Sequence, residues 1–105
     1  MIDVLIQGRL RGGMTLKQSQ NGNTYAAFRL GTTDKNGEAL LCSCITFDAA
    51  AVEAVLRLED GDALAVSGEA AITLWQDKQG HTRSGLDVKV HQAMSAYHAG
   101  RKRPG

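Results

Sequence analysis

Proline is almost absent from this chain of 105 residues, since Pro104 is the only one, and a Pro-rich linker is therefore excluded. Long apolar runs are also missing, so we expect no helix that crosses a bilayer. The first residues, MIDVLIQGRLRGG, lack the basic start, long apolar stretch and small-residue cleavage site of a signal peptide. These absences make the cytoplasm the expected location and give no reason to expect a membrane partner.

Cysteine is scarce as well, with Cys42 and Cys44 as the only two. One intervening residue is the wrong spacing for the usual zinc pairs, and no second pair completes four ligands. On a strand, side chains two residues apart point the same way and are poorly placed to form a disulfide. We expect both to be small buried apolar groups, and the sequence indicates no metal.

Residues that could carry catalysis are few. The three histidines, His81, His91 and His98, fall in a predicted turn, a strand end and the chain end. No Cys–His or Ser–His pair has a recognisable context, and GRLRGG lacks the strand–loop–helix setting of a phosphate-binding loop. The sequence therefore predicts a protein that is not an enzyme and needs no cofactor.

What is present fits one domain of 11.2 kDa with 43% hydrophobic and 22% charged residues. A chain of this length buries roughly two-thirds of its unfolded surface, which is enough for one core without metal or disulfide staples. The net charge of +1 is unremarkable, but its distribution is uneven. Five cations face two acids in residues 1–35, one cation faces eight acids in 36–77, and six cations face one acid in 78–105. If both basic ends fold onto one surface, that face suits a polyanion. The alternative interpretation is an ordinary surface of mixed charge.

Alternation of apolar and polar residues predicts a β-protein with one helix. Asp48 is expected to cap the helix, because its carboxylate can accept hydrogen bonds from the free amides of the first turn. Gly61 is expected to provide the C-terminal stop of the helix. Asn21-Gly22 is a hairpin signal, and Gly8 and Gly68 are expected to mark a bend or bulge. The expected strands cover residues 2–10 with a continuation to 18, 24–33, 39–47, 62–75 and 82–91, and the helix covers 49–58.

Three strands, a helix and two strands follow the order of a five-stranded oligonucleotide/oligosaccharide-binding (OB) Greek-key barrel, with the helix between the third and fourth strands. We expect this all-β domain to span residues 1–97 and a short basic tail to span 98–105. Other small β-barrels with one helix have the same pattern.

Five aromatic residues limit where bases could stack. Trp75 alternates away from Ile72 and Leu74, which places it on the outer face. Phe28 has the pattern of a core residue. Phe47 fits equally well under the helix or on the binding face, and the pattern leaves Tyr25 and Tyr97 undecided.

Several segments together resemble the bacterial single-stranded DNA-binding protein family over about 90 residues, in order and with matching gaps. They are VLIQGRL (4–10), QNGNTYAAFRLGTT (20–33), ITFDAAA (45–51), LEDGDALAVSGEAAITLWQDKQGHTR (58–83) and LDVKV (86–90). The resemblance implies an OB-fold protein that binds single-stranded DNA with little sequence preference, in replication, recombination or repair. It also implies a homo-oligomer, either a tetramer or a dimer as in primosomal replication proteins.

Carried over by position, the resemblance places base stacking on Trp75 and Phe47 and a backbone contact on Lys17. Leu41 stands where the family often has tryptophan, and Asp60 stands where it commonly has lysine. The chain also lacks the family's acidic tip, so replication or primosome partners would have to bind in another way. The further cations expected along the groove are Arg9, Arg11, Arg29, Lys35, Lys78, Arg83 and Lys89. The alternative is a protein–protein adaptor of a primosome or mobile element with weak DNA affinity.

Overall fold

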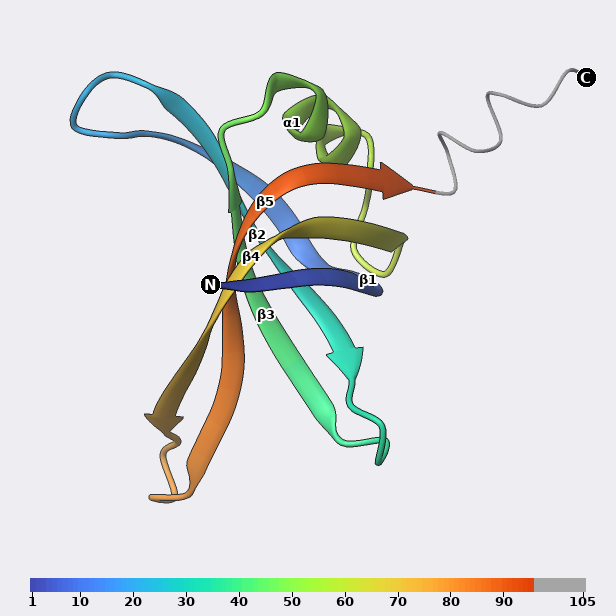
Figure 1. The fold of residues 1–105 in the computed structure, drawn as a ribbon, viewed down its shortest axis with the longest axis vertical. Coiled ribbons are helices and arrows are strands. Elements are labelled where there is room, and N and C mark those ends of the chain that lie inside the picture. The colour runs from blue at the N-terminus through green and yellow to red at the C-terminus, as the bar shows by residue number, and fades with distance from the viewer. Residues whose placement is uncertain (96–105) are drawn as a thin grey trace, which may run out of the picture.

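The computed structural model describes residues 1–95 as a closed five-stranded barrel with one helix. The strands join in the order β1-β2-β3-β5-β4, and all neighbours are antiparallel except β3 and β5, which run parallel. Hairpins extend from the barrel as arms (Figure 1). The elements are β1 (Ile2–Gln18), β2 (Thr24–Thr33), β3 (Ala39–Thr46), α1 (Ala49–Leu56), β4 (Ala63–Gln76) and β5 (Thr82–Ser95). This confirms the expected OB barrel and the place of its helix.

The core comes from the inward positions of all five strands, as alternation requires of a sheet with one buried face. Cys42 and Cys44 are buried and free of a disulfide, and Phe28 is 4% exposed, as expected for each. The remaining buried residues of the cluster are Leu10, Leu30, Val55, Leu64, Val66, Val88 and Val90.

β1 is one continuous strand that is distorted, but not interrupted, at Gly12. Its register against β2 shifts between Arg11 and Thr15, and Gly12 has a φ of 75°, which glycine adopts without penalty. No bulge forms at the expected Gly8, where pairing with Leu64 continues. The strand instead changes partner near this point, from β4 to β2.

α1 closes one end of the barrel and packs against β5. The Asp48 carboxylate accepts a hydrogen bond from the Ala51 amide at 2.9 Å, which confirms the predicted cap. The helix ends at Leu56, two residues before the expected end. Ala51, Ala54 and Val55 form its buried side.

β4 and β5 extend beyond the barrel as an arm, and this corrects the expected orientation of two β4 side chains and the expected end of β5. Ile72 and Leu74, expected to point inward, are 67% and 70% exposed because the β4–β5 arm has passed the core at that point. β5 runs to Ser95, four residues beyond the expected end, because its last residues pair with the start of β4. A register shift between Ser67 and Gly68 separates the two halves of this pairing. The expected tail, residues 98–105, and the end of the expected domain at 97 lie outside the described residues.

Candidate nucleic-acid interface

Strand pairing gathers charged residues on one outer face of the barrel, here called the groove face. Arg11 pairs with Arg29, Arg29 with Ser43, and Ser43 with Asp87. Directly paired residues point to the same side of a sheet, so this row crosses four strands on one face. The next row along the strands holds Lys89 and Glu69, which pair with each other.

A hollow of about 900 Å³ lies over these rows. Ser43 and Ile45 contribute to its floor, with the buried Phe28 beneath. Its charged lining is mixed but mainly cationic, and consists of Arg11, Lys17, Arg29, Lys89, Glu69 and Asp87.

A second hollow of about 500 Å³ adjoins the first and shares Arg11 and Arg29 with it. Trp75 lines it and is 41% exposed, together with Arg83 and Leu41. This position confirms the outward orientation of Trp75. The two hollows therefore lie next to each other on the groove face and are together called the groove, and the indole lines the smaller one.

Glycines in the floor allow flat side chains to lie against the sheet. A Cβ added at Gly85 would lie 3.0 Å from the Trp75 ring, and one added at Gly31 would lie 2.5 Å from Nε of Arg11. The indole and the guanidinium therefore rest directly on these two backbone positions. Leu41 pairs with both glycines and lies between them.

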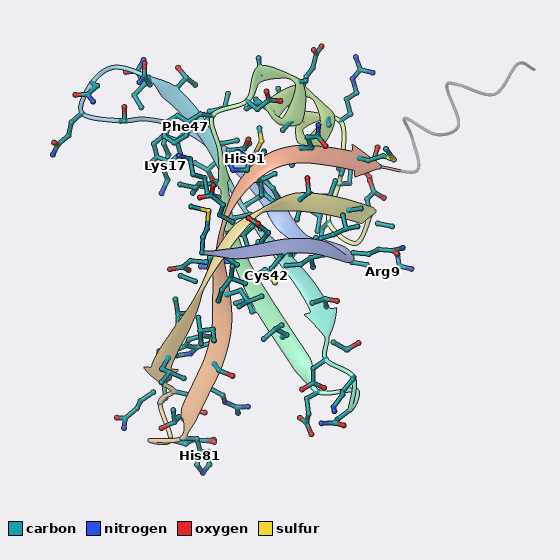
Figure 2. All side chains as sticks on the ribbon, in the orientation of Figure 1. Arg9, Lys17, Cys42, Phe47, His81 and His91 are labelled. Carbon is teal, nitrogen blue, oxygen red and sulfur yellow. The ribbon has the colours of Figure 1, made fainter. Side chains whose placement is uncertain are left out.

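The other end of the groove face carries an aromatic pair. The rings of Tyr25 and Phe47 have centroids 5.2 Å apart and are tilted by 39°. Phe47 is 44% exposed, so its expected alternative as a core residue under the helix is wrong. Tyr25 pairs with Lys17 across β1 and β2, and Figure 2 shows Lys17, Phe47 and His91 in the same region. Alternation alone had left Tyr25 undecided.

The β4–β5 turn fixes Arg83 beside Trp75. Oδ1 of Asp77 accepts from the amides of Gln79 and His81, both at 2.9 Å, and its Oδ2 accepts from Nε of Arg83 at 3.0 Å. The His81 amide bond, together with Arg83, holds the pKa of Asp77 below its usual value. The turn thus holds one cation of the groove in place.

Three of the expected cations lie away from both hollows. Nη1 of Arg9 donates to the carbonyl of Gly61 at 2.9 Å, in a third hollow that adjoins the second and shares Arg11 and Gly31 with it. Lys35 is exposed in the β2–β3 turn, and Lys78 is exposed in the β4–β5 turn. The structure therefore brings together Trp75 with Arg11, Lys17, Arg29, Arg83 and Lys89 along the groove.

The structure shows what Asp60 and Leu41, the two departures from the family pattern, contact. Oδ1 of Asp60 accepts from the Gly12 amide at 2.7 Å and so ties the β1 distortion to the turn before β4. Leu41 is half-buried in the groove floor beside Trp75. Sequence reasoning missed the Asp60 bond, because 48 residues separate its partners.

Residues 1–95 contain no cluster suited to a metal ion. No group of three or more His, Cys, Asp or Glu side chains in that range could hold a metal ion. Burial raises the pKa of Cys44 to about 12, with smaller contributions from Cys42 and Asp87, so this thiol stays protonated at neutral pH. Within the same range no helix has the length and apolar character to span a membrane.

Comparison with known proteins agrees with this geometry. The model of the single-strand binding protein family matches residues 1–95, whereas no curated protein matches the chain. The small single-stranded DNA-binding protein of Streptomyces coelicolor has a similar structure, with a TM-score of 0.70, 20% identity, and coverage of 90% of this chain and 93% of that one. The mitochondrial single-stranded DNA-binding protein of S. cerevisiae gives a TM-score of 0.67 at 16% identity, with the same coverage of both chains.

Proposed function

The chain belongs to the single-strand binding protein family, and on this premise we propose that it binds single-stranded DNA along the groove face without reading a defined sequence. It acts as a binding protein and not as an enzyme. Its role is to protect or organise unpaired strands during replication, recombination or repair in the cytoplasm.

One observation carries this proposal: exposed aromatic rings lie in and beside a groove lined with cations. Trp75 lines the smaller hollow, and the Tyr25–Phe47 pair lies beyond the larger one, where Tyr25 pairs with the lining residue Lys17. Stacking of a base on an aromatic ring contributes roughly 1–3 kcal/mol and tolerates any base, because every base has a π-face. The two sites therefore supply affinity without sequence readout.

Cations between the aromatic sites supply the remaining affinity through the phosphates. Arg11 and Arg29 line both hollows, while Lys17 and Lys89 line the larger one and Arg83 the smaller. Contacts of this type release counterions from the nucleic acid, so the affinity falls as salt is added. Lys35, Lys78 and Arg9 lie off the groove, and we assign them at most a contribution to the surrounding field.

The test is the affinity of labelled oligo(dT) for variants of the groove. Trp75→Ala removes a stack and should weaken binding by about 5- to 150-fold, the equivalent of roughly 1–3 kcal/mol. Phe47→Ala should weaken it in the same range. Leu56→Ala serves as the matched control, because Leu56 is 55% exposed on α1 and lies outside both hollows. Binding that is absent in the wild type at low salt would favour the adaptor alternative.

We also propose that the protein acts as a homo-oligomer, either a dimer or a tetramer. Ile72 and Leu74 are large apolar residues exposed side by side along one face of the β4–β5 arm. A second copy that packs against this face would cover both side chains and remove their apolar surface from water. Linked binding sites in one assembly increase the affinity for a long strand. Replication or primosome proteins are further proposed partners.

A further inference from the structure

The charges of the groove face are divided between its two sides. Arg11, Lys17 and Arg29 come from β1 and β2, whereas β4 and β5 contribute both acids, Glu69 and Asp87, and one cation, Lys89. Both acids line the larger hollow, at the place where a polyanion is proposed to bind. A carboxylate there repels phosphate and can only accept hydrogen bonds.

Asp87 is the acid whose carboxylate is available. Within residues 1–95 it forms no ion pair and no side-chain hydrogen bond, and its residue is exposed. Glu69, in contrast, lies 3.4 Å from Nε2 of His91 and pairs with Lys89 across the strands. The Asp87 side chain therefore faces the hollow as an acceptor without a partner in the described part of the protein.

Asp87 lies across β3 from Arg29, and Lys89 lies two residues along β5 from Asp87 on the same face. Ser43 lies between Asp87 and Arg29 in the same row, so two strand spacings, roughly 10 Å, separate their backbones. In the complex proposed below, a phosphate is held at Arg29, its sugar and base lie across β3, and the base edge reaches the Asp87 carboxylate.

Base chemistry decides what a carboxylate at this place would favour. An ionised carboxylate only accepts hydrogen bonds, and cytosine and adenine offer an exocyclic amine that donates two. The corresponding edge of thymine has one imide N–H between two carbonyl oxygens, which the carboxylate repels. In a single strand these edges are free to be read. We propose that Asp87 makes the groove prefer amine-bearing bases over thymine, an inference that rests on the proposed function.

The experiment compares oligo(dC) and oligo(dT) of equal length at low salt and pH 8, where cytosine is unprotonated. The measured quantity is the Kd for oligo(dT) divided by the Kd for oligo(dC). Asp87→Asn and Asp87→Ala should each lower this ratio by about three- to tenfold relative to the wild type, the effect of one typical hydrogen bond, because they weaken the cytosine complex and relieve the repulsion of the thymine carbonyls. Glu53→Gln, which makes the same charge change on α1, should leave the ratio unchanged.

Each other outcome overturns the inference in a recognisable way. If both Asp87 variants tighten binding of the two oligonucleotides by the same factor, Asp87 acts by repulsion of phosphate alone and selects nothing. If the wild type binds oligo(dT) and the ratio does not change, the inference fails while the proposed function stands. If the wild type binds neither oligonucleotide, both fail.

Discussion

Replacing Gly85 with alanine tests whether the indole of Trp75 rests on the sheet. The added Cβ would lie 2.6 Å from the carbonyl oxygen of Leu41 and 3.0 Å from the Trp75 ring. Gly85 does not have a positive φ, so alanine suits its backbone conformation and any effect comes from these contacts. The oxygen of Leu41 belongs to the paired strand and cannot move aside without disturbing the β3–β5 ladder.

The size of the effect follows from two opposing contributions. Forcing extra volume into a packed site costs typically about 1–3 kcal/mol. Replacing glycine by alanine returns about 0.4–1 kcal/mol, because it reduces the freedom of the unfolded chain. We expect Gly85→Ala to lower the free energy of unfolding by about 1–2 kcal/mol, and to lower the Tm by roughly 5–15 °C for a domain of this size.

Two matched variants separate this contact from a general effect of alanine in a strand. At Gly31 the nearest atom is the flexible side chain of Arg11, so Gly31→Ala should cost little stability while it displaces the guanidinium and weakens oligonucleotide binding. At Gly13 nothing lies within 4 Å of an added Cβ, so Gly13→Ala should leave stability nearly unchanged.

Urea unfolding gives the stabilities, and emission from Trp75, the only tryptophan in the chain, reports the position of the ring. In Gly85→Ala the emission maximum should shift to longer wavelength as the indole lifts into water. A Gly85→Ala variant with wild-type stability and an unchanged emission maximum would refute the packing of Trp75 on Gly85.

Three further predictions concern stability and assembly. Asp48→Ala removes the helix cap and should cost about 1 kcal/mol in urea unfolding; an unchanged midpoint would contradict the bond to the α1 amide. The pKa of Asp77 is lowered in the folded state. The contribution of Asp77 to stability is therefore present above the pKa of the unfolded carboxyl group, about 3.9, and is lost as the pH falls through the lower pKa of the folded state. The Tm difference between the wild type and Asp77→Asn should therefore shrink below about pH 4, and a difference that stays constant into acid would argue against it. Ile72→Glu combined with Leu74→Glu should reduce the mass of the assembly measured by light scattering, whereas an unaltered mass would exclude the arm from the subunit contact.

The strands and helix cap could be predicted from the sequence because their signals are local. Alternation predicted β2 with its bounds at residues 24 and 33, and the carboxylate of Asp48 predicted the start of α1. Local patterns also indicated that Trp75 points away from the core. Each of these features depends on residues only a few positions apart.

The remaining features depend on where distant segments meet. Alternation gives the side of a strand but not the point at which the barrel ends, so Ile72 and Leu74 were wrongly expected inside. The same ambiguity left Phe47 and Tyr25 open until their contact was known. Asp87 entered the groove through the parallel pairing of β3 with β5, which no local pattern indicates.

The most direct measurement of the central claim is the emission of Trp75 during titration with oligo(dT). A base stacked on the indole removes it from water and quenches its fluorescence, so the account predicts saturable quenching at low salt that is reversed when salt is added. Binding that is detected by a label on the oligonucleotide but leaves the Trp75 emission unchanged would contradict the account, because the strand would then lie away from the groove face.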